Sequence, residues 1–471
     1  MAEAKALVRA ALATRIPSAD VERLADDEAL SSLGFDSVAL IALTAELQRS
    51  AGVGIDDEVL FAPDVSIASL AEAIGAALAP AVATGRRQFV EVAGLGVVAP
   101  TGHGVSELWQ SLLSGQAHRV PAPYQPQRGH FVGAVPGSGA KEITDPDRLF
   151  TLLYTAGEEA LGDAQTQDRK RIHLVIGTTD TGGNALTHAL EAVREKGGAP
   201  SSTPSGSPFA GTIARRAGAA LGLGGSATVI GSASAAGAVA LGHALELLRA
   251  DEADEVLVVG VDTVSRTAFH GLGSLRTLSP RGCRPFSSDR GGIAVSEAAA
   301  AILLRRPGTG PAGRSRGRLI GYGASSFTTH LAAPEAAGIE LAVRRAVADA
   351  GIGLPDVSFV NAHGPGTRQG DIAETDALRS IFGAGLPGVA LNSSKGLLWH
   401  CQGAAGVIES QVCLLSLAHG VLTPTTGMES TDQRFTDLDI VTEPREFPAR
   451  YALSISCGLG GINTALVWER A

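Results

Sequence analysis

The chain has 471 residues, of which 45% are hydrophobic and 4% aromatic, and it carries a net charge of −10. Its length is typical of two or three domains, and a composition with 59 glycines is that of a globular α/β protein rather than a fibrous or disordered one. The acidic balance excludes nucleic acid as an expected partner. A charged, amphipathic N-terminus and the lack of a long apolar run argue against membrane contact, so we expect a cytoplasmic protein.

Residues 1–80 form the first predicted domain. They hold 13 acidic and 5 basic residues, whereas residues 81–471 hold 35 and 33, so most of the net charge lies in the first segment. Such an asymmetry marks a separate acidic module. Apolar periodicity predicts helices over 4–14, 38–49 and 67–78. The module is therefore expected to be a small all-α helical bundle.

Ser37 lies at the start of the second of these helices, in the motif Leu-Gly-Phe-Asp-Ser. Asp36 can cap the helix, and Leu40, Leu43 and Leu47 are expected to face inward. On these residues alone, an ordinary capped helix remains an alternative. The motif in an acidic, all-helical module resembles an acyl carrier protein. The resemblance implies that a phosphopantetheinyl transferase attaches 4′-phosphopantetheine to Ser37, as a thiol arm that holds acyl groups as thioesters.

Residues 81–88 are interpreted as a linker, because the chain there lacks periodicity and is rich in small residues. About ten linker residues span only about 15–20 Å, so Ser37 would need its own arm to reach a pocket on the same chain. Strand-like and helical runs then alternate over 89–471, which favours a layered α/β domain. Comparable opening strands over 90–98 and 318–324 indicate an internal duplication.

A strand, a run of small residues and a helix surround Ser234. Val229 and Ile230 suit a buried strand, and leucines at helical spacing follow the small residues. A serine at the start of a helix lies where free N–H groups and the helix dipole favour developing negative charge. Ser234 is therefore either an acyl-transfer nucleophile or part of a tightly packed turn without chemistry.

Three further polar side chains lie in Gly/Ser-rich loops next to apolar strands. They are His363, Lys395 and His400. Two histidines and a lysine, added to a serine at a helix start, can activate a nucleophile and bind a carbonyl oxygen. The four cysteines lack the pairing or His spacing of disulfides and zinc sites, so we expect neither a disulfide nor a metal site.

The order of these motifs over 89–471 resembles the β-ketoacyl synthases of fatty acid and polyketide assembly. The resemblance implies a thiolase-type fold with five α-β-α-β-α layers, and a homodimer. It places Ser234 where the family has its catalytic Cys, and it places His363, His400 and Lys395 on the family's two His and its Lys. Glu297 matches an acid that usually lies close to that Lys.

The serine is a departure with chemical consequences. A thiol has a pKa near 8.5, whereas an aliphatic hydroxyl needs a base, for which His363 or His400 is available. Cys457 replaces a gating Phe, and its backbone N–H would complete an oxyanion hole with that of Ser234. Trp399 replaces the Gly before the second His. These exchanges suggest a reshaped acyl pocket, although compensating packing changes explain them equally well.

Three functions follow from these residues and the resemblance. The first is transfer of an acyl group from pantetheine to Ser234, on the chain's own carrier or a separate one, followed by decarboxylative condensation or transfer to another acceptor in polyketide biosynthesis. The second is a non-catalytic partner similar to a chain-length factor. The third is decarboxylation of malonyl-type thioesters without acylation of Ser234.

Overall fold

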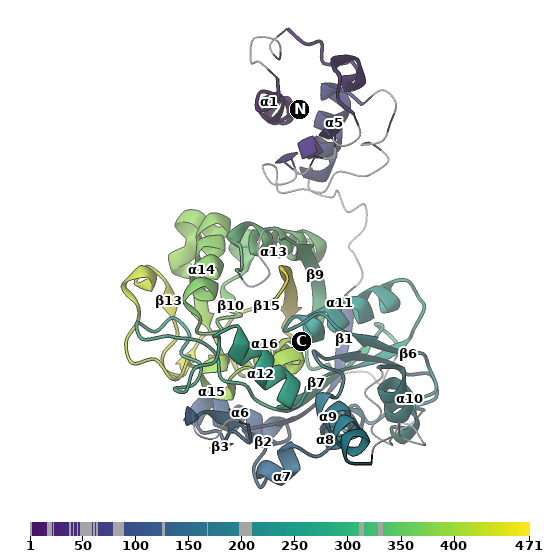
Figure 1. Cartoon of the computed structure of the whole chain (residues 1–471), viewed down its shortest axis with the longest axis vertical. Coiled ribbons are helices and arrows are strands. Elements are labelled where there is room, and N and C mark those ends of the chain that lie inside the picture. Colours follow the sequence, from purple (N-terminus) through teal and green to yellow (C-terminus); the bar gives the residue numbers. More distant parts are fainter. Residues whose placement is uncertain are drawn as a thin grey trace. The chain divides into compact units, whose positions relative to one another are not determined.

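The computed structural model divides into two compact units, Met1–Arg86 and Arg87–Ala471 (Figure 1). It describes residues 2–16, 21, 23–36, 39–40, 42–44, 46–47, 59, 62, 65–78, 89–124, 128–166, 168–196, 210–309, 315–327 and 333–471. Ser37 and the predicted linker 81–88 lie outside the described residues. The domain boundaries 1–80, 81–88 and 89–471 stay predictions.

The first unit is helical. Its elements include α1 Ala2–Leu12, η1 Leu30–Leu33 and α5 Ile67–Leu78, and the described residues between 39 and 47 are helical as well. The backbone N–H of Ala39 donates to Asp36 Oδ1 at 2.8 Å, and that of Leu40 donates to the Asp36 carbonyl at 2.9 Å. Leu40, Leu43 and Leu47 are buried, as predicted. A helix capped by the Asp36 side chain therefore follows this residue.

The second unit is built on one large mixed sheet. Its order is β13-β11-β10-β15-β16-β9-β1-β8-β7-β5-β6, with β2 paired to β1. The strands of this sheet are β1 Val90–Ala99, β2 Gly102–His103, β5 His173–Gly177, β6 Ala227–Ile230, β7 Glu255–Asp262, β8 Ala298–Arg305, β9 Arg318–Ser326, β10 Phe359–Asn361, β11 Ala390–Asn392, β13 Asp439–Ile440, β15 Tyr451–Gly458 and β16 Ile462–Glu469. Two small antiparallel sheets of two strands each complete the strands: β3 Arg119–Pro121 with β4 Phe131–Gly133, and β12 Val421–Leu422 with β14 Arg445–Glu446.

Some helices cover the outer faces of the folded sheet, and others are packed between its two halves. The helices are α6 Val105–Ser114, α7 Ala140–Ile143, α8 Arg148–Asp163, α9 Gly183–Lys196, α10 Ala210–Ala220, α11 Ala236–Arg249, α12 Arg266–Ser274, α13 Ala336–Ala350, α14 Arg368–Phe382, α15 Lys395–Leu398 and α16 Ala405–His419. Short 3₁₀ turns are η3 Leu354–Asp356, η4 Gly383–Gly388, η5 Gln402–Ala404 and η6 Gln433–Phe435.

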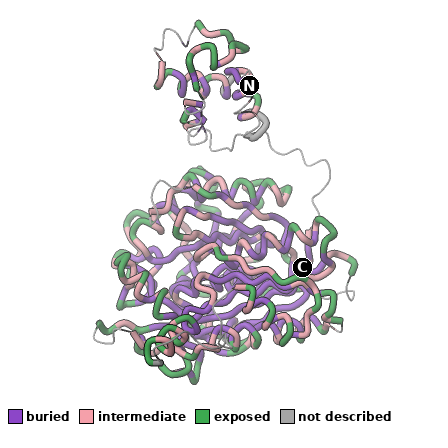
Figure 2. Tube along the Cα trace, turned by 45° about the vertical axis from the view of Figure 1, so that its right-hand side comes forward, coloured by how far each residue is buried: buried purple, intermediate pink, exposed green. Residues whose placement is uncertain are grey.

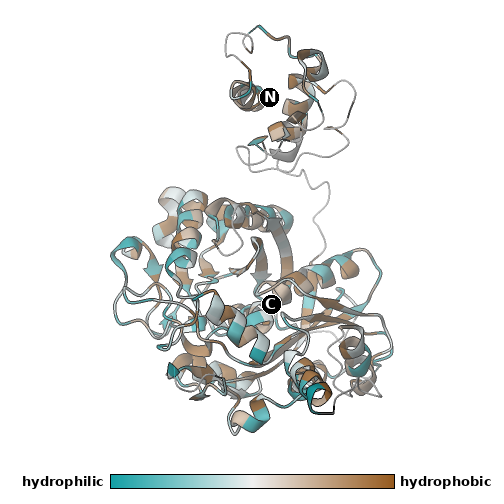
Figure 3. Ribbon diagram, in the orientation of Figure 1, coloured by the Kyte–Doolittle hydropathy of each residue, from teal (hydrophilic) through white to brown (hydrophobic). Residues whose placement is uncertain are grey.

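Helices and strands alternate in five layers, and three hydrophobic clusters hold these layers together. One cluster joins α8 to β7 and β8, a second surrounds α11 and α16 in the centre, and a third joins α13 and α14 to β10 and β15. The central helix α16 contacts strands of both halves of the sheet, and its residues from Ala405 to Leu417 are all buried. Figure 2 shows burial concentrated on the sheet and central helices, and Figure 3 shows the same elements in apolar colours. The predicted thiolase-type α-β-α-β-α architecture is confirmed.

The two predicted opening strands, β1 and β9, pack against their neighbouring helices in the same way. A Cβ added at Gly94 of β1 would lie 2.1 Å from the Ala160 carbonyl oxygen of α8, and one at Gly321 of β9 would lie 2.3 Å from the Ala346 carbonyl oxygen of α13. Only glycine lets each helix approach its strand so closely. The backbone N–H of the next residue then donates to an aspartate of that helix at 3.0 Å in both halves. The predicted duplication is therefore visible in the packing.

Among the helices that the structure describes, none is long and apolar enough to cross a membrane.

Candidate functional site

The turn between β6 and α11 presents Ser234. Ala233, directly before it, has φ 47°, a left-handed conformation that is uncommon for a residue with a side chain. Gly237 in the first turn of α11 packs on the Gly403 carbonyl, where a Cβ would lie 2.7 Å away. Small residues therefore allow the turn, and Ser234 remains half-buried at the start of the helix.

The loop between β10 and α14 carries His363. Its backbone N–H and that of Gly364 donate to the two carboxylate oxygens of Glu374 in α14, at 2.7 and 2.8 Å. Ser393 Oγ donates to the Gly364 carbonyl at 2.9 Å. The loop is thus held at its backbone, which leaves the imidazole of His363 for other contacts.

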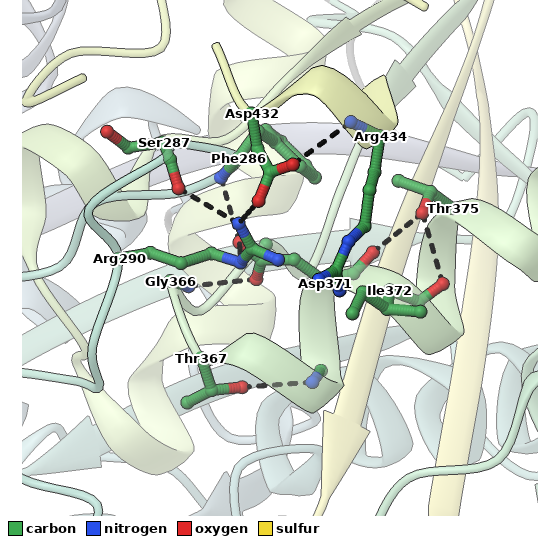
Figure 4. A network of polar contacts seen from close by, with 12 residues as sticks. Phe286, Ser287, Arg290, Gly366, Thr367, Asp371, Ile372, Thr375, Asp432 and Arg434 are labelled. Carbon is green, nitrogen blue, oxygen red and sulfur yellow. Dashed lines mark hydrogen bonds and ion pairs between the residues drawn. The ribbon is translucent and has the colours of Figure 1, made fainter. Parts of the chain in front are cut away.

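A buried polar network fixes the far end of the same loop (Figure 4). Asp371 accepts from the backbone N–H groups of Phe286 at 2.8 Å and Gly366 at 3.0 Å. Arg290 lies 3.6 Å from Asp371 and also pairs with Asp432, as Figure 4 shows. Burial raises the pKa of Asp371 to about 7. This network joins the 284–290 segment to the start of α14, close to His363.

The segment from β11 to α16 carries Lys395 and His400. Lys395 begins α15, is buried, and forms an ion pair with Glu409 of α16. Glu409 is therefore the acid beside the lysine. The expectation that Glu297 lies close to Lys395 is corrected, because Glu297 instead pairs with Arg148 at 2.6 Å and accepts from the Val135 backbone at 3.0 Å.

One cleft of about 400 Å³ brings most of the predicted residues together. Ser234, His363, His400 and Cys457 all line it, whereas Lys395 lies behind them. Its wider lining includes Leu272, Arg276, Ile339, Thr367, Arg368 and Leu459. The volume is in the range of small-molecule sites. Trp399 is not among the residues that line this cleft.

The two histidines are close and buried. Their ring centroids are 5.6 Å apart, with the rings nearly perpendicular. Burial, with a smaller contribution from Lys395, lowers the pKa of His400 to about 3 and that of His363 well below its usual value. Both imidazoles are therefore neutral at pH 7.

Hydrogen bonds fix the tautomer of His400. The backbone N–H of Gln402 donates to His400 Nδ1 at 3.0 Å. Since Nδ1 accepts, the proton of a neutral ring is on Nε2, which makes that nitrogen a donor. Nδ1 of His363 has no hydrogen-bond partner among the described residues.

Cys457 is the second-last residue of β15 and lies next to the turn that carries Ser234. A Cβ added at its neighbour Gly458 would lie 3.0 Å from the Ser232 carbonyl oxygen and 3.2 Å from Ala233 Cβ, so this strand end contacts the turn. Burial raises the pKa of the Cys457 thiol well above its usual value. A thiol held protonated is a weak nucleophile.

Sequence reasoning missed several buried acids of the site. Asp262, at the end of β7, accepts from Thr178, Thr179 and the Gly403 backbone at 2.6–3.1 Å, which ties the turn after His400 to two strand ends. Burial raises its pKa to about 7. Glu409 is the one acidic residue of α16, whose other residues are mostly apolar or small, and that isolation is the signal that could have identified it.

Comparison with known proteins agrees with this geometry. A family model described as the β-ketoacyl synthase N-terminal domain matches residues 88–308, one described as the β-ketoacyl synthase C-terminal domain matches residues 316–429, and one described as a phosphopantetheine attachment site matches residues 6–74.

Individual relatives are similar over the same region. Nodulation protein E of Rhizobium sp. (strain N33) is 27% identical over 401 residues, which covers 81% of this chain and 99% of that protein. The 3-oxoacyl-[acyl-carrier-protein] synthase 2 of Vibrio cholerae is 28% identical over 413 residues, covering 82% and 99%. A solved structure of the ishigamide ketosynthase/chain length factor superposes with a TM-score of 0.75 at 27% identity, covering 82% of this chain and 100% of that one. The chain therefore belongs to the β-ketoacyl synthase family, with a phosphopantetheine carrier domain preceding its synthase domains.

Proposed function

We propose that this chain transfers an acyl group from a pantetheine thioester to Ser234 Oγ and then condenses it with a second, decarboxylated acyl unit in polyketide assembly. The observation that carries the proposal is the shared cleft of Ser234, His363 and His400. The family of condensing enzymes supplies the reaction class. Burial, with a smaller contribution from Lys395, keeps the two imidazoles neutral, and Lys395 itself is paired with the buried Glu409.

In the loading step, Ser234 Oγ attacks the thioester carbonyl carbon. His363 is the better base. In His400, Nδ1 already accepts from the Gln402 backbone and Nε2 carries the proton, so that ring can donate a hydrogen bond but has no free nitrogen to accept a proton. The backbone N–H groups of Ser234 and Cys457 stabilise the oxyanion. The proton taken by His363 passes to the departing thiolate, and the product is an ester on Ser234 and a free thiol.

In the condensing step, a malonyl-type thioester loses CO₂. The resulting enolate oxygen accepts a hydrogen bond from His400 Nε2. The carbanion attacks the ester carbonyl of Ser234 and the new C–C bond forms. The ester C–O bond breaks, and Ser234 Oγ takes up a proton from solvent through His363, because the proton that His363 took in the loading step has left with the thiol. An oxygen ester is a poorer electrophile than a thioester, so this step is slower than it would be with Cys.

The carrier domain supplies the proposed donor. We place 4′-phosphopantetheine on Ser37, where it supplies the thiol that holds the acyl group. The helix that follows Asp36 supports this position. Treatment with coenzyme A and a broad phosphopantetheinyl transferase should add the mass of the arm to wild type and not to Ser37→Ala. A gain that persists in Ser37→Ala contradicts the assignment.

We also propose a homodimer, with acyl-loaded carrier, its own or separate, as substrate partner. Strand β6 is at one end of the sheet of the second unit, and an end strand offers unpaired backbone groups to another chain. Sedimentation should show a dimer at micromolar concentration. A monomer there would contradict this part of the proposal.

Two alternatives remain within the same family. The chain could decarboxylate malonyl-type thioesters without acylating Ser234, or serve as a non-catalytic partner of an active synthase. The cleft with both histidines favours catalysis over the second. Peptide-level mass after incubation with an acyl thioester separates them. Only the transferase gains acyl mass on the peptide that contains Ser234, and only the decarboxylase releases CO₂ from a malonyl thioester without that gain.

Ser234→Cys tests the fate of the acyl group. If condensation is the native reaction, the thioester that forms should condense faster than the wild-type ester. A stalled thioester without condensed product would instead favour transfer to an oxygen or nitrogen acceptor.

A further inference from the structure

The residue directly before His400 has an unusual backbone. Trp399 has φ 60° and ψ −162°. This conformation belongs to a region that essentially only glycine adopts, because a Cβ there is crowded by the neighbouring carbonyl groups. A tryptophan held in this conformation needs an identifiable compensation.

The conformation follows from two fixed neighbours. Trp399 donates its backbone N–H to the Lys395 carbonyl at 2.9 Å, which closes α15. His400 donates its own N–H to the Ala294 carbonyl at 2.8 Å and accepts from the Ser296 N–H at 3.0 Å. The chain must therefore reverse at Trp399, between a helix and a bridge that are both hydrogen-bonded.

Arg119 of β3 holds the side chain of Trp399. Its guanidinium carbon lies 4.2 Å from the centre of the indole ring, within the range of a cation–π contact. The same guanidinium donates to the His118 carbonyl at 3.0 Å and to the Leu397 carbonyl of α15. On another side, a Cβ added at Gly282 would lie 2.6 Å from Trp399 Nε1, so the indole packs directly on this glycine.

The guanidinium charge of Arg119 is directed at the Trp399 ring and at carbonyl oxygens. Among the described residues no carboxylate forms an ion pair with it. Burial lowers its pKa to about 10, so it remains a cation at pH 7. A half-buried cation without an acidic partner is balanced here by an aromatic face and two carbonyl oxygens.

We propose that Arg119 and Trp399 form a clamp that holds the strained turn before His400 and thereby positions the His400 imidazole for catalysis. Neither residue touches the reacting atoms, so both are positioning residues. The inference rests on the proposed function for its kinetic readout. It also makes a claim about the backbone that can be measured without activity.

The test compares four variants of the full-length chain: Trp399→Ala, Trp399→Gly, Arg119→Met and the double variant Arg119→Met/Trp399→Gly. Alanine keeps the steric conflict and removes the clamp, whereas glycine removes the conflict itself. Trp109 is the matched control, since it stacks on His419 at 4.4 Å from within helix α6. In that helix alanine should be more stable than glycine.

The first readout is thermal unfolding followed by tryptophan fluorescence, because all three tryptophans lie in the second unit. We expect Trp399→Gly to unfold about 2 °C above Trp399→Ala, the reverse of the order at Trp109. The same order at both positions would overturn the claim that Trp399 is strained.

The second readout is kcat and KM for decarboxylation of a malonyl thioester. Trp399→Ala and Arg119→Met should each lower kcat on the order of 10²-fold, with KM within about threefold of wild type. The double variant should recover most of the loss of Arg119→Met, because glycine no longer needs the clamp. If Arg119→Met lowers kcat as much in the Trp399→Gly protein as in wild type, Arg119 acts by another route and the proposed clamp is wrong.

The two readouts separate the clamp from the proposed function. If wild type shows neither acyl loading nor decarboxylation, the proposed function fails, and the unfolding order still decides whether the turn is strained and clamped.

Discussion

The two halves of the second unit share a scaffold and differ in chemistry. In each half a glycine of the opening strand, Gly94 or Gly321, lies directly under a helix carbonyl, and a central helix, α11 or α16, follows a turn that carries a residue of the cleft. Ser234 precedes α11 and His400 precedes α16. Even the backbone agrees, since Ala233 and Trp399, the residues directly before them, both have positive φ.

The difference lies in what surrounds each turn. The buried residues of α11 are all Ala, Gly or Leu, whereas those of α16 include Glu409, the partner of Lys395. The first half therefore supplies the cleft with a neutral hydroxyl, that of Ser234, beside a compact helix start, and the second half supplies it with the ionisable side chains His363 and His400. The duplicated fold thus carries the hydroxyl that we propose as the nucleophile on one half and the side chains that we propose act on it on the other half.

The largest effect should come from removing His363, the residue of the second half that we propose as the base. His363→Ala is expected to slow acyl transfer to Ser234 by about 10²–10⁴-fold, the usual loss for a general acid–base group. His188→Ala is the control, because His188 is exposed and its ring contacts the Thr144 carbonyl at 3.0 Å, outside the cleft. Single-turnover loading followed by mass spectrometry measures both. Equal rates for the two variants would mean that the second half does not supply the base.

The buried charge of the second half gives the next effect. Lys395→Met leaves Glu409 buried without its partner and should lower the free energy of unfolding by about 3–5 kcal/mol. Lys395→Met/Glu409→Leu removes both charges and should recover most of that loss. Denaturant titration followed by tryptophan fluorescence reports the second unit. A single variant as stable as wild type would show that the pair is not structural.

Because the two halves pack strand on helix in the same way, equivalent substitutions in them should lower the free energy of unfolding by similar amounts. Gly94→Ala and Gly321→Ala each force a Cβ against a helix carbonyl and should each lower the free energy of unfolding by about 1–3 kcal/mol. Gly162→Ala is the control, because its Cβ would meet nothing within 4 Å on helix α8. That variant should gain about 0.4–1 kcal/mol. If only one of the two strand glycines is costly, the halves are not packed alike.

A pH dependence gives the smallest effect. The pKa of folded His400 is about 3, whereas an unfolded histidine titrates near 6.5, so protons bind more tightly to the unfolded chain. The stability that His400 contributes is therefore present above pH 6.5 and lost as pH falls toward 3. Between pH 6.5 and 5, wild type should lose about 1–2 kcal/mol more than His400→Gln. Parallel stability curves for the two proteins would contradict a buried, neutral His400.

Much of the architecture could be predicted because periodicity and motif order are local. The helix predicted over 67–78 has the same bounds as α5, and the strands predicted over 90–98 and 318–324 coincide with β1 and β9 to within two residues. The helix predicted over 4–14 is found two residues earlier, as α1. Helix ends are set by capping contacts that periodicity does not contain.

The cleft was predicted in part. Ser234, His363 and His400 could be grouped because each stands in a recognisable loop, whereas the acid beside Lys395 could not. The turn that contains η5 brings Lys395 and Glu409 together, and the path of the backbone through this turn could not be predicted from the sequence. The side-chain position of Trp399 was also missed, because it depends on a φ that the sequence does not reveal.

The most direct test of the central claim is a peptide-level map of acyl mass after the full-length protein is incubated with an acyl thioester. We expect the acyl group on the peptide that contains Ser234, no loading at that position in Ser234→Ala, and unchanged acyl mass on the carrier domain of that variant. An acyl group on Cys457, or none in the second unit of wild type, would contradict the account.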